Sequence, residues 1–373
     1  MARARATTDS EALPEIDRLE GLPHPRETQT LFGHEMAERT LAEALGSGRM
    51  HHGWLLTGRD GIGKATLAYR FARAALAHPD ERDPKCQSLA ISDNTIASHQ
   101  VRSLSHPGLL IIRRSFDVKT KRFTTSISTE AVRRLRSFLA HRTADDTWRI
   151  VIVDKADELN LNAANALLKS LEEPPPGTVF LLVSATPGRL LPTIRSRCRT
   201  LILQPLSNDA LRVAATQALL ADGQEQPGVA DWPILERLAD GSVGRLLGLW
   251  AAGGLEQNRR ISKLTEGLPK IDWRSVHALA DDLQPAAAQQ HFDLFFELFL
   301  GHLARLIRAQ VTDEGTPAER ELAGRLIGEG RLASFAALWE RVAREKAETV
   351  ALNLDRKTLI LDTVSGLVEA AQR

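Results

Sequence analysis

Short apolar runs alternate with stretches of helical periodicity from about residue 31 to residue 205. The apolar runs indicate buried strands at residues 53–57, 109–112, 149–153, 178–184 and 200–203. Helical spacing indicates helices at residues 36–45, 64–78, 130–141 and 162–173, and residues 113–122 fit a strand–turn–strand. Short apolar strands that alternate with helices predict a parallel sheet covered on both faces.

The pattern changes after residue 206, where the strand signals end. Residues 207–265 predict several short helices broken by glycine and proline, and residues 270–373 predict helices with larger apolar faces. Two stripes there follow the i, i+3, i+4, i+7 spacing of one helix face. They comprise Phe292, Phe295, Phe296, Phe299, Leu303 and Leu306, and Leu332, Phe335, Leu338, Trp339 and Val342. Such stripes form either the core of a helical bundle or an exposed face for a partner helix.

These changes of pattern predict several domains, as the length of 373 residues also does. We expect a mobile arm at residues 1–28, an α/β parallel-sheet domain at 29–205, a small helical domain at 206–267 and a helical domain at 268–373. A hydrophobic content of 43% and a charged content of 25% are ordinary for globular proteins and exclude disorder as the main state.

The overall charge limits how the chain can meet nucleic acid. Lys and Arg total 48 and Asp and Glu total 47, a net charge of +1, whereas a protein that coats nucleic acid alone is far more basic. The two cysteines, Cys86 and Cys198, cannot form a disulfide framework and fit a reducing cytosol. With no signal peptide pattern and no apolar run of about 20 residues, we expect a soluble, cytoplasmic protein.

Residues 58–65 match the phosphate-binding pattern G-x-x-x-x-G-K and then depart from it. In such a turn the backbone N–H groups and the N-terminus of the following helix face a phosphate, and the lysine adds charge. The candidate phosphate-binding residues are Gly58, Gly61, Gly63, Lys64 and Thr66. The hydroxyl residue that normally binds Mg²⁺ is replaced by Ala65. Thr66 points about 100° away around the helix and is a poor substitute. The alternatives are a nucleotide site and a glycine-rich turn without nucleotide.

The strand at 149–153 ends in a second altered motif. In P-loop ATPases this strand carries a metal-binding Asp, followed at once by a Glu that activates water. Here Asp154 occupies the metal-binding position, but Lys155 occupies the position of the base, and an ammonium group cannot accept a proton. Asp157 and Glu158 follow, and we expect them to begin or cap the next helix. Two altered motifs together predict that efficient hydrolysis is absent.

Three motifs carry a resemblance to a known family. The runs DKADELN at 154–160 and NALLKSLEEPP at 165–175, with Arg-Ser-Arg-Cys at 195–198, resemble the clamp-loader branch of the AAA+ family. The resemblance is strong from about residue 31 to residue 205 and weaker afterwards. It implies an AAA+ P-loop domain, a helical lid and a helical collar in a pentameric ring that places a sliding clamp on primer–template DNA. The partners that it implies are motor and delta subunits, the clamp, and DNA through the assembled ring.

The resemblance also assigns roles to single residues. Arg197 of the Ser-Arg-Cys motif would reach the γ-phosphate of ATP on the neighbouring subunit, and its alternative is a structural ion pair. Ser184 would be the polar sensor after the fourth strand. Arg245 falls near the lid arginine, one position late, with Gly244 at the usual place. Cys198 is expected to be a small buried residue.

The cofactors that follow are limited. ATP or ADP could occupy the P-loop, and Mg²⁺ would enter only with nucleotide. Zinc is not expected, since the interval that holds a four-cysteine module in many relatives contains Cys86, His99 and His106 without a ligand set. No carboxylate constellation for nucleotidyl transfer is apparent, so any polymerase activity would belong to a holoenzyme.

A basic stretch at residues 101–149 holds eleven Arg or Lys and four Asp or Glu, a local charge of +7. Its cations are Arg102, Arg113, Arg114, Lys119, Lys121, Arg122, Arg133, Arg134, Arg136, Arg142 and Arg149. The alternatives are a solvated face or subunit interface, and a surface that follows DNA phosphates without reading sequence.

Three functions remain possible from the sequence. The first is a clamp-loader subunit with a degenerate P-loop that donates Arg197 in trans. The second is a self-sufficient AAA+ ATPase, either the loader's motor or a related DNA-repair ATPase, against which Ala65 and Lys155 argue. The third is a P-loop kinase, against which the helical region after residue 206 argues.

Overall fold

The computed structural model describes residues 14–16, 18, 22–140 and 148–372. Their contacts form two compact units, Met1–Trp232 with Ala239–Leu246, and Pro233–Leu238 with Leu247–Arg373. This grouping is coarser than the expected division into a sheet domain and two helical domains, whose boundaries stay predictions.

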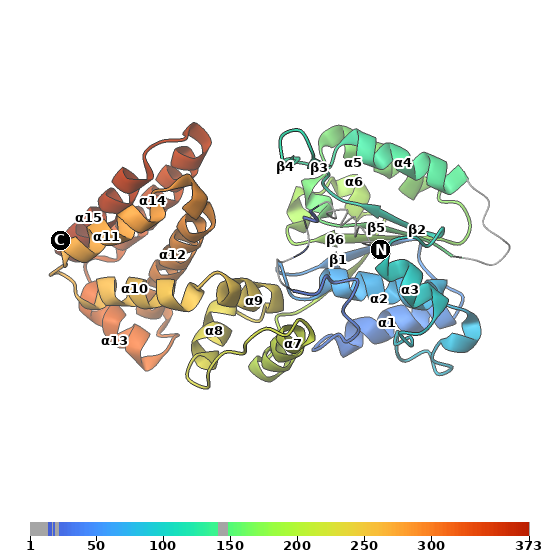
Figure 1. The fold of residues 1–373 in the computed structure, drawn as a ribbon, viewed down its shortest axis with the longest axis horizontal. Helices are drawn as coiled ribbons and strands as arrows, with labels where there is room; N and C mark the ends of the chain where they lie inside the picture. The colour runs from blue at the N-terminus through green and yellow to red at the C-terminus, as the bar shows by residue number, and fades with distance from the viewer. Residues whose placement is uncertain (1–13, 17, 19–21, 141–147, 373) are drawn as a thin grey trace, which may run out of the picture. The chain divides into compact units, whose positions relative to one another are not determined.

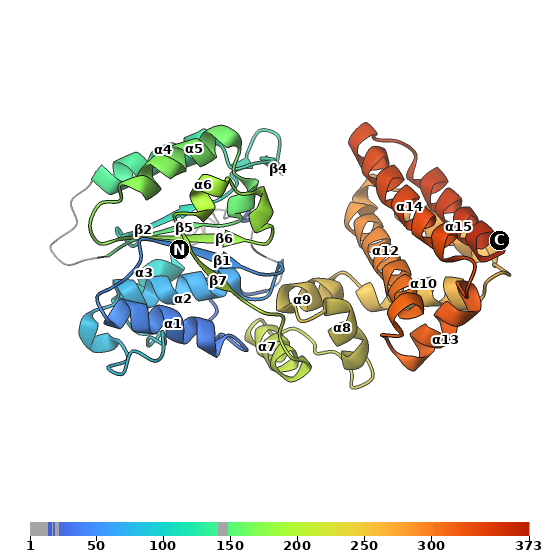
Figure 2. The same ribbon diagram turned by 180° about the vertical axis from the view of Figure 1, so that it is seen from behind.

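The first unit is built on a five-stranded parallel sheet with the order β2-β5-β6-β1-β7 (Figures 1 and 2). Its strands are β1 Gly53–Thr57, β2 Leu109–Ile112, β5 Arg149–Val153, β6 Thr178–Ser184 and β7 Arg199–Ile202. Every residue of β1 and β6 is buried, which explains their continuous apolar runs. A hairpin of β3 (Phe116–Asp117) and β4 (Arg122–Phe123) lies outside the sheet. The predicted parallel sheet is confirmed.

Helices cover both faces of this sheet (Figures 1 and 2). One face carries α1 Glu35–Gly46, α2 Lys64–Leu76 and α3 Ile96–Arg102, and the other carries α4 Thr129–Ala140, α5 Leu161–Glu172 and α6 Pro192–Arg195. The remaining elements up to residue 251 are η1 Pro79–Glu81, η2 Ala156–Glu158, η3 Pro187–Arg189, α7 Asn208–Ala221, α8 Trp232–Ala239 and α9 Val243–Ala251. α3 was not predicted, because its short sequence has no clear apolar period.

The interpretation of residues 1–28 as a mobile arm is wrong for the end of that segment. His24 is fully buried, and Glu15 accepts hydrogen bonds from Arg26 at 2.7 Å and from Arg113, beyond β2, at 2.6 Å. Burial would raise the pKa of Glu15, but the two guanidinium groups bring it down to about 2. A carboxylate shared between two arginines therefore fixes this segment to the sheet domain. The first thirteen residues lie outside the described part of the chain.

The second unit is a bundle of helices around α12. Its elements are α10 Gly254–Glu266, α11 Trp273–Leu283, η4 Ala286–Ala288, α12 Gln289–Thr312, α13 Pro317–Leu326, α14 Leu332–Leu352 and α15 Arg356–Gln372. The phenylalanine stripe of α12 is buried throughout, as expected for a bundle core. The stripe of α14 is divided: Phe335, Leu338 and Val342 are buried, whereas Leu332 and Trp339 are 36% and 37% exposed.

Among the described residues, no helix is long and apolar enough to cross a membrane.

A charged cluster lies inside the second unit, around His302 of α12. The ring is buried, and its Nε2 lies 3.1 Å from the hydroxyl of Thr265. Glu319 pairs with Arg305 at 3.0 Å and with Arg237 at 3.7 Å. Burial, reinforced by the two arginines and opposed by Glu319, lowers the pKa of His302 to about 4. The imidazole is thus neutral at pH 7.

Acid is expected to destabilise the second unit through this histidine. The folded pKa lies below the unfolded value of about 6.5. The contribution of His302 to the free energy of unfolding is therefore fully present above pH 6.5 and is lost as the pH falls toward 4. The loss attributable to His302 should be about 3 kcal/mol. Chemical denaturation at pH 7 and pH 4.5 should show a smaller acid-induced loss for His302→Gln than for the wild type.

The matched control is His291→Gln, because His291 is exposed on the same helix. This variant should keep the wild-type pH dependence. An equal acid-induced loss in all three proteins would rule out the buried ring as the cause.

Candidate functional site

The turn between β1 and α2 has the backbone conformation that its glycines predict. Gly58, Gly61 and Gly63 have φ values of 139°, 73° and 109°. Gly58 also approaches the chain after β7 so closely that an added Cβ would lie 2.4 Å from the carbonyl oxygen of Leu203. His34 holds the turn from the other side, with its Nε2 2.6 Å from the carbonyl oxygen of Ile62.

Lys64, the candidate phosphate ligand, is turned into its own loop. It is buried, and its ammonium group donates to the carbonyl oxygens of Gly58, at 2.8 Å, and Arg59. Burial lowers the pKa of Lys64, although nearby Asp60 and Asp154 act in the opposite direction. Two of the three ammonium hydrogens are therefore bound within the loop.

Residues 240–244 close over the same turn. The Ser242 hydroxyl donates to the carbonyl oxygen of Asp60 at 2.7 Å, and the Gly244 amide donates to the carbonyl oxygen of Gly61 at 2.9 Å. Arg59 forms an ion pair with Asp240. A Cβ on Gly244 would lie 2.9 Å from the Cα of Gly61, so this contact requires glycine.

The acidic strand end lies beside this closed turn. Asp154 directly follows β5 and is buried. Lys155, in the position of the catalytic base, pairs with Asp60 of the turn at 3.3 Å. Burial would lower the pKa of Lys155, but the carboxylates around it, Asp60 first, raise that pKa above its usual value. Lys155 is therefore a firmly charged cation and not a base.

The expectation that Asp157 begins or caps the next helix holds in part: Asp157 lies in the first turn of the short helix η2, but it caps no helix. Its carboxylate accepts from the Ala185 amide at 3.2 Å and from the Thr186 hydroxyl at 2.7 Å, beyond the end of β6. The cap of α5 is Asn160, whose side chain accepts from the Ala163 amide at 2.8 Å. The aspartate thus joins two strand ends.

The other candidate residues, Ser184, Thr66 and Arg245, lie on three different elements. Ser184 is buried at the end of β6, in register with Thr57 of β1, and so lies at the same edge of the sheet as the turn. Thr66 lies in the first turn of α2. Arg245 is half-buried in α9, and its backbone amide donates to Ser242 at 3.2 Å.

The groups at this turn do not fit a hydrolysing site for Mg²⁺ and ATP. Ala65 offers no hydroxyl to a metal, and Lys155 offers no basic oxygen or nitrogen to water. Lys64 already donates to carbonyl oxygens of its own loop. No catalytic step can be derived from this arrangement.

The Ser-Arg-Cys motif lies between α6 and β7, and its three residues have different surroundings. Cys198 packs against the apolar cluster that includes Leu171 and Ile194, and burial raises the pKa of its thiol to about 11. Arg197 instead directs its guanidinium outward, where it is 37% exposed and pairs with Glu172 of α5 at 2.9 Å. The thiol is an inert packing group, whereas Ser196 is exposed and Arg197 is partly exposed.

The basic stretch is partly neutralised by ion pairs. The pairs are Arg102 with Asp93, Arg113 with Glu15, Arg114 with Glu158 and Arg133 with Glu130. α4 buries Val132 and Leu135 and exposes its three arginines, Arg133, Arg134 and Arg136. Arg142 lies outside the described residues. The exposed arginine face of α4 remains a candidate phosphate-binding surface.

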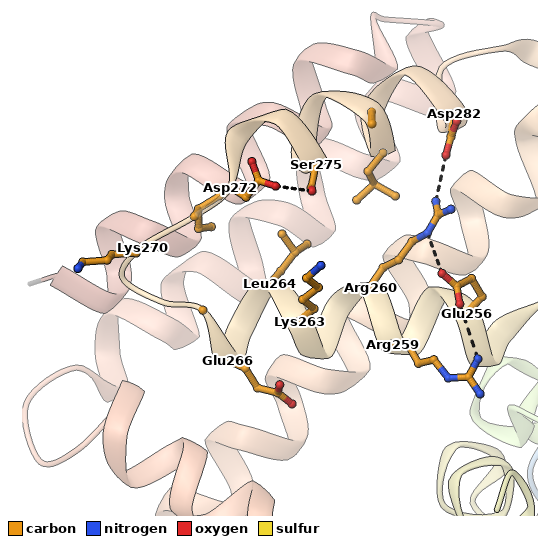
Figure 3. Close-up of a pocket in the computed structure, with 14 residues that line it drawn as sticks. Glu256, Arg259, Arg260, Lys263, Leu264, Glu266, Lys270, Asp272, Ser275 and Asp282 are labelled. Atoms are coloured by element: carbon orange, nitrogen blue, oxygen red, sulfur yellow. Dashed lines mark hydrogen bonds and ion pairs between the residues drawn. The ribbon is translucent and has the colours of Figure 1, made fainter.

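A groove of about 770 Å³ lies in the second unit, between α10 and α11 (Figure 3). Its charges neutralise one another: Arg260 pairs with Glu256 at 3.4 Å and with Asp282 at 3.1 Å, and Arg259 also pairs with Glu256. Sequence analysis singled out none of these residues. The balanced charge gives the groove no clear preference for an anion or a cation.

In the part of the chain that the structure describes, no three His, Cys, Asp or Glu side chains gather to hold a metal.

Two features of the site could not be predicted from sequence. Residues 240–244 meet the turn across about 180 positions of chain, and the sole hint was a glycine, Gly244, where the resemblance expects arginine. Glu172 belongs to a quoted motif, but nothing in that motif indicates its pairing with Arg197.

Comparison with known proteins points to one family. Residues 33–207 match the family model described as "DNA polymerase III, delta subunit". The delta' subunit of DNA polymerase III from Pseudomonas aeruginosa is 31% identical over 286 residues, which cover 74% of this chain and 78% of that protein.

Two further relatives match over shorter segments. The Bacillus subtilis delta' subunit is 30% identical over 173 residues, 46% of this chain and 48% of that protein. The Escherichia coli tau subunit is 28% identical over 229 residues, which cover 60% of this chain and 32% of tau. The match thus spans about a third of the longer tau protein.

Closure of the turn can be tested with two glycine substitutions in α9. In Gly244→Ala the new Cβ would push residues 240–244 away from Gly61, and overpacking of this kind costs about 1–3 kcal/mol. In Gly248→Ala the Cβ would meet nothing within 4 Å, and the gain in helix propensity is up to about 1 kcal/mol.

Urea denaturation of both variants should therefore give shifts of opposite sign. Limited proteolysis should also cut the turn faster in Gly244→Ala. Equal stability of the two variants would contradict the close approach of Gly244 to Gly61.

Proposed function

Because the chain belongs to the family of DNA polymerase III delta-prime subunits, in the clamp-loader branch of the AAA+ proteins, we propose that it serves in DNA replication as a clamp-loader subunit. In this proposal it assembles with motor and delta subunits and helps to load the sliding clamp onto primed DNA. It contributes a surface arginine to a neighbour's ATP site and uses no ATP of its own.

The observation that carries this proposal is the contrast between the two motifs. At the P-loop, Lys64 is buried and donates to the loop's own carbonyl oxygens, and Lys155, in the position of the base, pairs with Asp60. At the Ser-Arg-Cys motif, Arg197 is held at the surface. An arginine supplied in trans neutralises charge that develops on the transferred phosphoryl group. The chain is thus better equipped to complete another subunit's site than its own.

The proposal gives nucleotide no catalytic role in this chain. ATP or ADP that entered the P-loop would find Lys64 bonded to the loop's carbonyls, and Mg²⁺ would lack the hydroxyl that Ala65 has replaced. We expect weak or no ATP hydrolysis by the chain alone, and no polymerase chemistry.

The alternative is a self-sufficient AAA+ ATPase, such as the motor of the loader or a related DNA-repair enzyme. This function needs a base where Lys155 stands and a metal-binding hydroxyl where Ala65 stands.

The exposed face of α4 supports a role in holding DNA. Arg133, Arg134 and Arg136 are exposed on this helix, which buries Val132 and Leu135. Such a row would contact phosphates without reading sequence, as a protein that meets any primed site requires. The modest net charge of +1 fits a contact that is shared with other subunits.

Arg197→Ala is the direct test of the trans role. In a loader complex whose only intact ATP site faces this chain, the variant should assemble normally but lower DNA-stimulated hydrolysis by about 10³-fold. Single-turnover ATP hydrolysis measures this loss, and gel filtration measures assembly.

The matched control is Arg195→Ala, because Arg195 is exposed two residues earlier. It should hydrolyse ATP at the wild-type rate. Normal hydrolysis with Arg197→Ala would refute the trans role, and brisk turnover by the purified chain alone would favour the self-sufficient ATPase.

Charge reversal tests the DNA surface. Replacing Arg133, Arg134 and Arg136 by Glu should weaken binding of the complex to primer–template DNA and lower the slope of log affinity against log salt by up to about 3. Reversal of three exposed arginines of the second unit, Arg274, Arg320 and Arg344, is the control. An unchanged affinity and slope for the α4 variant would exclude this surface.

A further inference from the structure

The guanidinium of Arg197 is held by two specific contacts. One terminal nitrogen donates to the backbone carbonyl of Thr193 at 2.9 Å, and the other lies 2.9 Å from the Oε1 atom of Glu172. One contact comes from α6 and the other from the end of α5. The plane of the guanidinium is therefore fixed from two elements.

The apolar packing beneath Arg197 and Glu172 fixes their positions relative to each other. Leu171, next to Glu172, and Cys198, next to Arg197, lie in the same apolar cluster. Both also approach Gly53 at the start of β1: an added Cβ there would lie 3.2 Å from the Cys198 sulfur and 3.5 Å from Leu171. In each pair of neighbours, one residue (Leu171 or Cys198) packs in the apolar cluster, and the other (Glu172 or Arg197) forms the ion pair at the surface.

The two contacts leave part of the guanidinium open. An arginine has five N–H donors in a planar fork. The contacts to Thr193 and Glu172 use one hydrogen on each terminal nitrogen. The Nε–H and the second hydrogen of each terminal nitrogen are not used by these two contacts. The arginine can keep both contacts and still present donors to a phosphate.

A stabilising role does not account for this pair. Both side chains are more than a third exposed, at 37% and 42%, and ion pairs of this kind add little to folding stability. What the carboxylate does provide is orientation, since a free arginine side chain samples many rotamers.

We infer that Glu172 is a positioning residue for Arg197, which holds the guanidinium in the orientation that a neighbouring subunit's phosphate meets. This inference rests on the proposed trans role of Arg197. Glu172 itself touches no substrate. It acts by limiting the number of side-chain conformations that Arg197 samples, so that less conformational entropy is lost when the guanidinium binds the phosphoryl group.

The test uses Glu172→Ala and Glu172→Gln in the assembled complex with a single intact ATP site facing this chain. Glu172→Ala should lower kcat by about 10-fold, within the 10²-fold that misplacement by an ångström can cost, and leave KM within about twofold. Glu172→Gln retains an oxygen acceptor for the guanidinium and should recover most of the rate. The double variant with Arg197→Ala should be no slower than Arg197→Ala alone.

The matched control is Glu173→Ala, since Glu173 is the adjacent exposed glutamate. It should keep the wild-type kcat. Thermal midpoints and assembly should match the wild type for all Glu172 variants. If both Glu172→Ala and Glu172→Gln lost rate in proportion to a loss of assembly, Glu172 would act in folding and the inference would be overturned.

The remaining outcomes separate this inference from the proposed function. If Arg197→Ala is slow but Glu172→Ala is normal, the positioning role is wrong and the trans role stands. If Glu172→Ala is faster than the wild type, the carboxylate competes with the phosphate and the inference is overturned. If Arg197→Ala itself is normal, the proposed function fails first.

Discussion

The backbone contact between Gly61 and Gly244 is the constraint on which the sheet domain's chemistry depends. Neither residue can carry a side chain, because each added Cβ would come within about 3 Å of the other glycine's backbone. The N–H groups of such a turn normally cradle phosphates. Here Ser242 and Gly244 donate to the turn's carbonyl oxygens, those of Asp60 and Gly61. The inward Lys64 and the pairing of Lys155 with Asp60 are consistent with a site that has become a structural joint.

One strand connects this joint with the arginine motif. The carboxyl end of β1 leads into the closed turn, and its first residue, Gly53, lies against the Cys198 sulfur. A shift of β1 along its axis would therefore disturb both places at once.

Sequence was sufficient for the elements whose signals are local. Continuous burial makes β1 and β6 apolar throughout, so both were recognised with their observed bounds. α3 was missed, because a short helix held by the Thr95 cap needs little apolar periodicity. The buried His24 and the shared carboxylate of Glu15 were missed for a different reason. A polar, aperiodic segment does not reveal that its charges have partners, such as Arg113, distant in the sequence.

The same limit applies to the site. Ala65 and Lys155 showed that the metal-binding hydroxyl and the base are absent, because each position of a motif requires a particular side-chain chemistry. They did not reveal what replaced that chemistry. Asp157 lies in the first turn of η2, as expected, but its carboxylate bonds to Ala185 and Thr186 beyond the end of β6 and caps no helix. Pairing across elements depends on tertiary packing, and no single stretch of sequence encodes it.

The separation along the chain between the turn and residues 240–244 has a consequence for synthesis. The turn is complete early, and His34 can hold it across 28 positions, but Ser242 follows Asp60 by 182 positions. Closing the longer loop costs roughly 2 kcal/mol more in chain entropy. A ribosome-bound nascent chain would therefore display an open P-loop for most of the domain's translation. The contact between Gly61 and Gly244 is then a late event in maturation.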